Sequence, residues 1–517
     1  MYAAGQRDMQ AMDKYTIEEI GLPGVVLMEN AGAKVVEEIV TTVPSKHSKV
    51  LILCGGGNNG GDGFVIARRL FDLGFSPSLF LLANPEKINS DAHVHFRAFQ
   101  NRGMSHKVWD EEQFALQLNN ADIIIDALLG TGVKGEVREP IRTAIEMVNR
   151  RQGNSLVISV DIPSGLNSDD GKAEGPAIIA DKTITFVFPK KGFFLQDGPL
   201  HVGNWKAVDI SVPPSIVNDL GLRLPKVITG ELVKASIPQR RPNGHKGTFG
   251  HVLVIGGSRP YVGAPLFSAK AALNSGAGLV TLAFPETIYP SVAAQCPEAL
   301  LWPLPDQDGH LTEKSIQILS SRINQFDCVA VGPGLSRFNE GTVFIKSLLS
   351  ILTGQPIVID ADALYFIRDD IPMLRQYNGS VLLTPHPGEM ATIGGKSVKQ
   401  IEENRLGIAQ SFALENNVWV LLKGHRPVIA TPSGELFINP YGNDALGKGG
   451  SGDVLTGVIA SFLAQGATPE QALISASYVH ARGGEEKAKE QSHYGVMPFD
   501  IIQAVKEQLN GVERSTI

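Results

Sequence analysis

The sequence predicts an α/β protein with two domains. Its 517 residues exceed what one hydrophobic core usually supports. In both halves, short runs of β-branched residues and leucine alternate with helical patterns, and this alternation is typical of mostly parallel sheets covered by helices. We therefore expect two α/β domains, one after the other.

A proline-rich segment separates the two halves. Any helix or strand within residues 212–247 should be interrupted, because this segment contains Pro213, Pro214, Pro225, Pro238 and Pro242. We place the boundary near residues 212–230, with domains at residues 1–215 and 231–510 and a linker at residues 216–230.

The apolar runs predict the strands of each domain. In the first domain they predict a helix at residues 63–73 and strands at residues 50–54, 78–82, 123–126, 156–161 and 183–187. This order predicts a Rossmann-like, three-layer domain with a mostly parallel sheet. The second domain repeats the pattern at residues 251–255, 279–283, 328–331, 357–360, 381–384 and 418–422.

Composition and charge exclude several classes of protein. The net charge is −7 and no basic block is present, which argues against a nucleic-acid groove. No apolar run approaches the roughly 18 residues of a membrane span, and charged residues within 1–14 stand where a signal peptide needs an apolar core. Cys54, Cys296 and Cys328 lack metal-site spacing and are expected to be buried small hydrophobes. A cytoplasmic enzyme is the expectation.

A glycine-rich turn in the second half predicts a phosphate site. The run Gly449-Gly450-Ser451-Gly452-Asp453 leads directly into an apolar helical start. Backbone N–H groups at such a helix N-terminus attract phosphate oxygens, and a carboxylate beside them can take a proton from an attacking hydroxyl. Two more polar turns, at residues 384–389 and 423–427, also follow apolar runs, so the three strand ends should share one crevice. A tight structural turn is the alternative for the glycine run alone.

The first half has a glycine-rich loop of its own, at residues 55–63. Its six glycines allow the backbone to approach the phosphates of a dinucleotide closely, and it lacks the lysine of a P-loop ATPase. Asp126 and Asp161 follow two other expected strands. Such carboxylates project into the ligand crevice, where they bind a cation or move a proton. A helix cap or a turn is the alternative for either aspartate alone.

Together these motifs resemble the NAD(P)H-hydrate repair proteins. Residues 58–63, Asp126 with Gly130-Thr131-Gly132, and residues 161–165 resemble their epimerase domain. The second half resembles their ADP-dependent dehydratase domain, which is similar in fold to ribokinase-type kinases. The motifs that carry this second resemblance are His245-Lys246-Gly247, Gly250-His251-Val252, Gly276-Ala277-Gly278, Thr384-Pro385-His386 and residues 449–453.

The resemblance implies repair of NADH and NADPH that have taken up water at C6 of the nicotinamide ring. The epimerase would interconvert the R and S hydrates, and the dehydratase would remove water from the S hydrate, converting ADP to AMP and phosphate. Asp453 would deprotonate the C6 hydroxyl as it attacks ADP. The N–H groups at Gly450, Ser451 and Gly452 would stabilise the charge that develops.

The resemblance also implies roles for other residues of the second domain. Substrate contacts would come from Ala264, Gly334 and His386, and Glu389 would place Mg²⁺ through water. The ADP pocket would be lined by Lys423, Gly424, His425, Arg426 and Pro427. A capping role for His386 and a solvated position for Lys423 are the alternatives, and Pro427 stands where many relatives should have threonine. For Asp360 and Asp362, a structural or loop-ordering role is favoured.

In the epimerase domain the resemblance implies Asp161 as the proton-transfer group. Asn59, Asp126 and Ser164 would bind K⁺, since oxygen ligands suit a hard cation. The substrate would contact Asn58, Asn59, Gly60, Gly61 and Asp62, and a covering turn made of Gly130, Thr131, Gly132, Val133, Lys134, Gly135 and Glu136.

Two other interpretations remain open at this stage. The chain could be a vitamin or sugar kinase with a non-catalytic N-terminal domain, or its N-terminal half could be an interaction module, since fold alone does not fix function. The presence of Asp126, Asp161 and the glycine loop argues against the module. Small-molecule substrates are the expected partners, and the resemblance implies a homo-oligomer.

Overall fold

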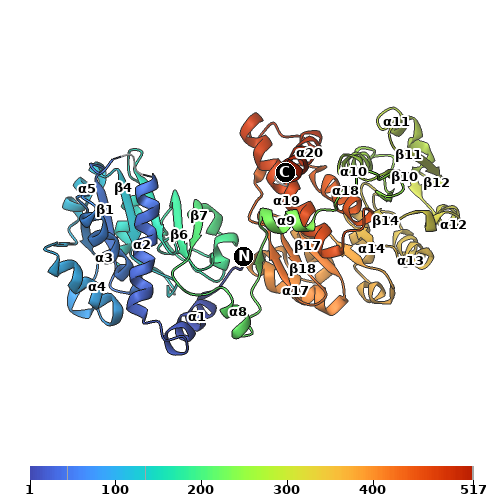
Figure 1. Cartoon of the computed structure of the whole chain (residues 1–517). Coiled ribbons are helices and arrows are strands. Elements are labelled where there is room, and N and C mark those ends of the chain that lie inside the picture. Colours follow the sequence, from blue (N-terminus) through green and yellow to red (C-terminus); the bar gives the residue numbers. More distant parts are fainter. Residues whose placement is uncertain (43–44, 134, 515–517) are drawn as a thin grey trace. The chain divides into compact units, whose positions relative to one another are not determined.

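The computed structural model describes residues 1–42, 45–133 and 135–514. The chain divides into two compact units, unit 1 up to Pro225 and unit 2 from Lys226 onward. In both units, helices cover the two faces of one sheet (Figure 1). The predicted α/β class is confirmed.

Unit 1 is built on a seven-stranded sheet in the order β3-β2-β1-β4-β5-β6-β7. Each neighbouring pair is parallel. The strands are β1 Val50–Cys54, β2 Ser78–Leu81, β3 Lys107–Val108, β4 Ile123–Ala127, β5 Leu156–Val160, β6 Lys182–Phe186 and β7 Asn204–Val208. The helices are α1 Gln6–Glu18, α2 Gly24–Thr42, α3 Asn58–Asp72, α4 Ser90–Asn101, α5 Glu111–Asn120, α6 Ile141–Asn149, α7 Gly198–His201 and α8 Ile216–Asp219, with short 3₁₀ turns η1 Pro85–Lys87 and η2 Lys191–Phe194.

Alternation along β1 divides the core of unit 1 into two layers. Ile52 and Cys54 pack with α1, α2, α3 and α4 on one face. Leu51 and Leu53 pack with α5 and α6 on the other. Successive strand residues point to opposite faces, so a fully apolar strand is buried on both sides, and the predicted three-layer arrangement is confirmed.

Unit 2 contains a ten-stranded sheet in the order β11-β10-β9-β14-β15-β16-β17-β18-β19-β8. Its strands are β8 Lys226–Val227, β9 His251–Ile255, β10 Leu279–Pro285, β11 Leu300–Leu304, β14 Cys328–Val331, β15 Ile357–Ile359, β16 Val381–Leu383, β17 Trp419–Leu422, β18 Val428–Ala430 and β19 Leu436–Ile438. The pairs β17–β18 and β18–β19 are antiparallel, and the others are parallel. A separate hairpin joins β12 Asp306–Gln307 and β13 His310–Leu311.

The helices of unit 2 also lie on both faces of the sheet. One face packs with α9 Gly230–Ser236, α10 Gly263–Asn274, α11 Tyr289–Ala293, α18 Ser451–Ala464, α19 Pro469–Gln491 and α20 Pro498–Arg514. The other packs with α12 Glu313–Ser320, α13 Gly341–Ile351, α14 Asp362–Ile367, α15 Pro387–Gly394, α16 Val398–Glu403 and α17 Arg405–Asn416. Short 3₁₀ turns are η3 Glu286–Ile288, η4 Ile323–Gln325, η5 Ile371–Gln376 and η6 Asp444–Leu446.

Several expectations about elements are wrong in detail. The glycine-rich segment was expected to be a loop up to residue 63, but α3 already begins at Asn58, so residues 58–63 form its first turns. The proline-rich segment 212–247 is not free of regular structure, because it carries α8, β8 and α9. The strand expected at 156–161 ends at Val160, where Asp161 turns into the left-handed region. The strands β3, β7, β8, β11, β18 and β19 had no counterpart among the predicted apolar runs.

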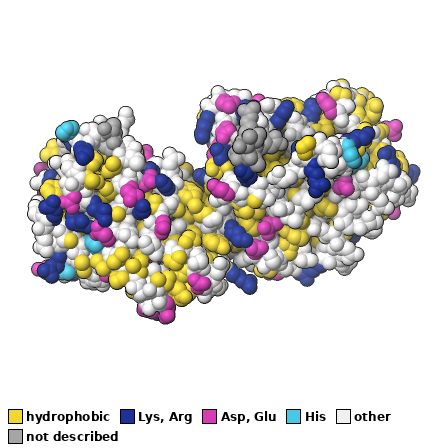
Figure 2. Space-filling model, in the orientation of Figure 1, with side chains coloured by type: hydrophobic (Ala, Val, Ile, Leu, Met, Phe, Trp, Pro, Cys, Tyr) yellow, Lys and Arg dark blue, Asp and Glu magenta, His cyan; other side chains and the backbone are white. Residues whose placement is uncertain are grey.

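Cysteine burial and surface charge agree with the sequence. All three cysteines are unpaired and buried, as predicted. Within the described residues, no helix is both long and apolar enough to cross a membrane. Lys and Arg side chains are interspersed with Asp and Glu over the visible surface (Figure 2).

Candidate functional site

Unit 1 has a cavity of about 630 Å³ at the carboxyl end of its parallel strands. Its lining includes the start of α3, the segment after β4 and the residue after β5, together with side chains of α1 and α2. This edge of a parallel sheet is where ligands bind in open α/β folds. The predicted site residues that line it are Asn58, Asn59, Asp62, Gly130, Thr131, Gly132, Val133 and Asp161.

Asp161 is held by hydrogen bonds at the floor of this cavity. Its φ of 64° lies in a region that few residues other than glycine adopt. One carboxylate oxygen, Oδ1, accepts hydrogen bonds from Thr185 Oγ1 at 3.1 Å, Phe186 N at 3.1 Å and Lys190 Nζ at 2.6 Å. The described part of the chain donates no side-chain or backbone hydrogen bond to the other oxygen. Asp161 therefore keeps Oδ2 available to a ligand.

The predicted K⁺ ligands lie together beneath the same cavity. Asp126 is fully buried and accepts hydrogen bonds from Ser159 Oγ at 2.8 Å and from Ser164 N and Oγ at 2.9 and 2.5 Å. Asn59 donates Nδ2 to Leu129 O at 2.9 Å, which leaves its buried Oδ1 without a hydrogen-bond partner. An orphaned buried oxygen beside a carboxylate, a hydroxyl and a carbonyl fits a hard cation of low charge.

Five of the predicted substrate residues lie elsewhere or outside the described residues. Gly60 and Gly61 do not line the cavity; they pack against Gly55 and Met28, where a Cβ would come within 2.0 and 2.4 Å of those residues. Gly135 and Glu136 are exposed and lie outside the lining. Lys134 lies outside the described residues.

Unit 2 brings its predicted catalytic aspartate to the N-terminus of α18. Gly450 is the N-cap with φ 98°, and Ser451, Gly452 and Asp453 form the first turn. The N–H groups of a first helical turn lack intrahelical partners and carry the positive end of the helix dipole. A cavity of about 500 Å³ brings Asp453 together with the predicted substrate residues Ala264 and Gly334, and with Tyr261, Ser336, Arg337, Ala361 and Asp362.

Asp453 is electrostatically suited to proton transfer near neutral pH. Burial, and then the neighbouring Asp360, raises the pKa of its carboxyl to about 7, with Lys423 opposing the shift. A general base works best when its pKa is close to the operating pH. Asp453 can therefore exchange a proton without a large energetic penalty.

Lys423 is mostly covered, with 17% of its side chain exposed, and it is ion-paired, so it is not a solvated surface lysine. Its Nζ lies 2.7 Å from Asp360 Oδ1 and 3.7 Å from Glu389 Oε2. Burial disfavours the ammonium form, but these carboxylates outweigh it and raise the pKa of Lys423. Asp360 also accepts from Thr456 Oγ1 at 2.6 Å, which agrees with the ordering role favoured for it. Asp362 likewise accepts a hydrogen bond from Ser336 N at 2.8 Å.

The turn predicted to line the ADP pocket starts beside the helix N-terminus. A Cβ added at Gly452 would lie 3.2 Å from Lys423 Nζ, so the two segments are adjacent. Arg405, a buried residue, fixes the turn from behind through hydrogen bonds to Leu422 O at 3.2 Å and Lys423 O at 3.0 Å. Burial also lowers the pKa of the neighbouring His425 and Arg426.

His386 and Glu389 form the N-terminal cap of α15. His386 Nδ1 accepts from Gly388 N at 3.0 Å, and Glu389 Oε2 accepts from His386 N at 2.7 Å. The capping alternative for His386 therefore describes its contacts in this structure, while its half-exposed ring leaves Nε2 at 3.5 Å from Glu389 Oε1. Glu389 Oε2 lies 3.7 Å from Lys423 Nζ, and Glu389 could help to place Mg²⁺ through water, which Mg²⁺ commonly retains.

Sequence reasoning missed four residues that shape the two sites. Asp13 of α1 lines the unit 1 cavity, and Lys190 pairs with Asp161 behind it. Arg405 and His480 support unit 2; His480 Nε2 lies 2.9 Å from Ser451 O, and burial lowers its pKa to about 4. Each is distant in sequence from the motif that it supports, so no local pattern identifies it.

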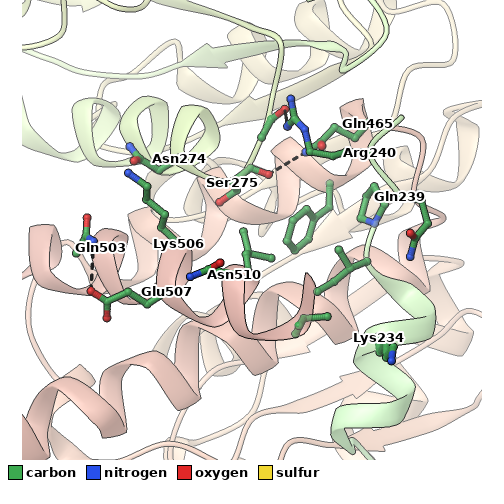
Figure 3. A pocket seen from close by; sticks show the side chains of 16 residues that line it. Lys234, Gln239, Arg240, Asn274, Ser275, Gln465, Gln503, Lys506, Glu507 and Asn510 are labelled. Atoms are coloured by element: carbon green, nitrogen blue, oxygen red, sulfur yellow. Dashed lines mark hydrogen bonds between the residues drawn. The ribbon is translucent and has the colours of Figure 1, made fainter. Parts of the chain in front are cut away.

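A further cavity, of about 610 Å³, lies at the other end of α18 (Figure 3). It is lined by parts of α9, α10, α18 and α20 and by Arg240, which donates to Gly276 O at 2.9 Å. Its lining residue Gln465 directly follows α18 and is twelve positions from Asp453, a separation of about 18 Å along a helix. None of the predicted site residues lines it.

Comparison with known proteins identifies the family. A family model described as NAD(P)H-hydrate dehydratase matches residues 252–507, and one described as YjeF-related protein N-terminus matches residues 24–192. The bifunctional NAD(P)H-hydrate repair enzyme Nnr of Moorella thermoacetica is 37% identical over 520 residues, which cover 99% of this chain and 97% of that protein. The chain belongs to the bifunctional NAD(P)H-hydrate repair enzyme family. Membership of this family favours the repair interpretation over a vitamin or sugar kinase.

Two solved structures are each similar to this member of the repair enzyme family over 56% of its length. One is the ADP/ATP-dependent NAD(P)H-hydrate dehydratase from Bacillus subtilis co-crystallised with ATP and Mg²⁺, at 30% identity, 56% coverage of this chain, 99% coverage of that chain and a TM-score of 0.49. Another is a ribokinase-like superfamily protein from Enterococcus faecalis, at 29% identity, 56% and 96% coverage and a TM-score of 0.48.

Proposed function

We propose that this enzyme repairs hydrated NADH and NADPH. Unit 1 interconverts the R and S hydrates, and unit 2 dehydrates the S hydrate with ADP, releasing AMP and phosphate. The observation that carries the proposal is the position of Asp453, at a helix N-terminus and facing the same cavity as Ala264 and Gly334. This arrangement combines a base with a phosphate-binding backbone.

The dehydration proceeds in two steps in this proposal. Asp453 takes the proton of the C6 hydroxyl, whose oxygen attacks the terminal phosphorus of ADP while AMP leaves. The N–H groups at the start of α18 stabilise the negative charge on the transferring phosphoryl group. Phosphate then leaves C6 as the ring nitrogen lone pair forms a double bond to that carbon, and loss of a proton from C5 restores the dihydronicotinamide.

Lys423 would assist this step as the cation nearest the phosphate-binding turn. Its ammonium is fixed by Asp360, and its distance from Gly452 suits contact with a bound phosphate. Arg405 holds the Lys423–Pro427 backbone, which would line the ADP pocket. Bound Mg²⁺ would neutralise phosphate charge, with Glu389 holding one of its waters.

In unit 1, Asp161 would transfer the proton and the Asn59, Asp126 and Ser164 oxygens would hold K⁺. The support for K⁺ is the unpartnered Asn59 Oδ1. Because this oxygen lies on the first turn of α3, a bound cation would fix the α3 turn against the segment after β4.

Recovery of dihydronicotinamide absorbance tests the two activities. The substrate is a mixture of R and S NADH hydrate, supplied with Mg²⁺, K⁺ and either ADP, ATP or no nucleotide. Full recovery with ADP and conversion of both epimers is the expected result. Recovery that stops at the S fraction would contradict the epimerase assignment, and no recovery with any nucleotide would contradict the dehydratase.

We further propose that the enzyme is a cytoplasmic homo-oligomer. The proposal follows the resemblance of the chain to the NAD(P)H-hydrate repair proteins. Light scattering on the purified chain measures the oligomeric state, and a mass equal to one chain would contradict it.

A further inference from the structure

Four carboxylates line the unit 1 cavity, each from a separate element. Asp161 follows β5, Asp62 lies in α3, Asp91 lies in α4 and Asp13 lies in α1. The epimerisation described above uses only Asp161. Asp13 lies far before the first motif that the sequence suggested, the glycine-rich segment at residues 55–63, so its position in the cavity is a result of tertiary structure.

Lys190 forms an ion pair with one of these carboxylates, Asp161. Lys190 has no exposed surface and does not line the cavity. Its Nζ donates to Asp161 Oδ1 at 2.6 Å and Thr185 Oγ1 at 2.9 Å, with the carbonyls of Phe186 and Phe188 at 3.4 and 3.2 Å. All its hydrogen-bonding capacity is used there, so Lys190 gives no hydrogen bond to Asp13 or Asp62.

Asp13 and Asp62 therefore lie near the Asp161 carboxylate. In the described part of the chain, neither of the two forms an ion pair with a lysine, arginine or histidine. Within the described residues, neither side chain takes part in a hydrogen bond. Burial, and then Asp161, raises the pKa of Asp13 to about 6, with Lys190 opposing; burial, Asp161 and Asp13 raise the pKa of Asp62 well above its usual range. Asp91 of α4 also lines the cavity and adds negative charge. Neighbouring carboxyls in a buried site cannot all ionise together.

The position of α1 is fixed by contacts to the segment that carries Lys190. Lys191 Nζ lies 2.8 Å from Asp8 Oδ2, and Lys191 N donates to Ala4 O at 3.0 Å. Gln6 N donates to Asp169 Oδ1 at 2.9 Å. The N-terminal end of the helix that carries Asp13 is therefore tied by backbone and charged contacts to the chain that follows Asp161.

We propose that Asp13 is a second proton-transfer residue of the epimerase, working with Asp161 on the hydroxyl at C6. This inference rests on the proposed epimerase function and deepens it. Asp13 is the better candidate than Asp62 because it is less deeply buried and its helix is separate from the glycine-rich segment expected to hold the dinucleotide.

The proposed reaction is balanced at each step. Asp13 donates its proton to the C6 hydroxyl, the C6–O bond breaks with its electron pair leaving on water, and the N1 lone pair forms an N1=C6 double bond. Water then adds to the opposite face of C6, the π electron pair returns to N1, and Asp161 takes the proton. Water in the cavity returns that proton from Asp161 to Asp13. The reverse epimerisation exchanges the two roles.

Asp13→Asn tests the proposal, with Glu18→Gln as the matched control. Both replace an acid by its amide on α1, but Glu18 is exposed and pairs with Lys14 at the surface. Purified R hydrate reports epimerisation by chromatography, and purified S hydrate with ADP reports dehydration. We expect D13N to slow epimerisation by about 10²-fold, with dehydration unchanged and E18Q equal to the wild type.

The pH profile separates proton transfer from a structural role. If Asp13 donates the proton, the wild-type kcat/KM for the R hydrate falls as pH rises through about 6, because the acid form is lost. D13N should lack this limb, and Asp13→Glu should restore it together with part of the rate. A slow D13N that keeps the wild-type limb would overturn the inference, as would a D13E no faster than D13N.

The outcomes also separate this inference from the proposed function. A wild-type chain that leaves the R hydrate unchanged above the spontaneous rate overturns both. An active wild type with a fully active D13N overturns only the role of Asp13. Thermal unfolding of D13N and E18Q checks that the loss of rate is not a loss of fold.

Discussion

Each unit places a largely buried lysine among carboxylates at the carboxyl edge of its sheet, and the two lysines face different environments. Lys190 is turned away from the unit 1 cavity and serves Asp161 alone among the carboxylates. Lys423 lies between Asp360 and Glu389 and close to the N-terminus of α18. A cation beside a helix N-terminus favours a bound phosphate. Lys190 lies behind the floor of the unit 1 cavity and does not line it. The carboxyl groups are therefore the groups that face a ligand there, and carboxyl groups suit proton transfer.

Asp453→Asn should have the largest effect and should separate the two sites. The amide cannot take the proton of the C6 hydroxyl, so we expect dehydration of the S hydrate to fall by about 10³-fold. Epimerisation of the R hydrate should be unchanged. The control is Asp444→Asn, an exposed aspartate just before the glycine-rich turn. Loss of both activities in D453N would mean that the two sites are not independent.

Replacing each lysine by methionine compares the stabilities of the two pairs. Breaking a buried ion pair from one side leaves an unpaired charge and typically costs 3–5 kcal/mol; we expect about 4 kcal/mol for Lys423→Met and about 3 kcal/mol for Lys190→Met. The difference follows from Asp360, which is 1% exposed, whereas the Asp161 side chain is 16% exposed and keeps two other donors. Hydrogen exchange of the strands of each unit measures both losses.

An exposed pair is the control for the lysine comparison. Lys346 and Asp370 lie 2.8 Å apart with both side chains substantially exposed. Lys346→Met should therefore cost less than about 1 kcal/mol. A cost for the buried pairs as small as this control would show that solvent reaches them.

Gly450→Ala should disturb unit 2 by about 2 kcal/mol. The glycine has φ 98°, and an added Cβ would lie 2.7 Å from Pro498 Cγ and 2.8 Å from the Phe267 ring. Gly449 is the matched control, because nothing lies within 4 Å of its added Cβ. Thermal unfolding should show a lower midpoint for G450A than for G449A, and equal midpoints would contradict the strain argument.

The two activities should respond to pH in opposite directions. Dehydration requires the Asp453 carboxylate, so its kcat/KM should rise with pH up to about 7, where burial places the pKa, by about tenfold per pH unit below it. Epimerisation of the R hydrate should instead fall above about 6 if Asp13 acts as the acid. Both profiles can be measured on one preparation with the separate epimers. D453N should lose the dehydration limb and keep the epimerisation limb.

The sequence alone determined the α/β class, the central strands and the position of the two glycine-rich turns. These features depend on local patterns: a fully apolar run such as Val50–Cys54 must be buried on both faces, and glycines before an apolar helix allow close backbone approach to phosphate. The last three strands of the unit 2 sheet, β18, β19 and the edge strand β8, could not be predicted in the same way. They are two or three residues long, and pairing with a neighbour, rather than their own pattern, makes them strands.

Tertiary structure alone decided which distant groups set the chemistry. Asp13, Lys190, Arg405 and His480 carry no local motif, and each acts on a residue from another element. The roles implied for His386, Glu389 and the K⁺ ligands stay predictions. The fold sets the hydrogen bonds of Asp161 and the position of Asp453 at the start of α18. The physical reason is that a shift in pKa depends on burial and on charges a few ångströms away in space, and neighbours in space are not neighbours in sequence.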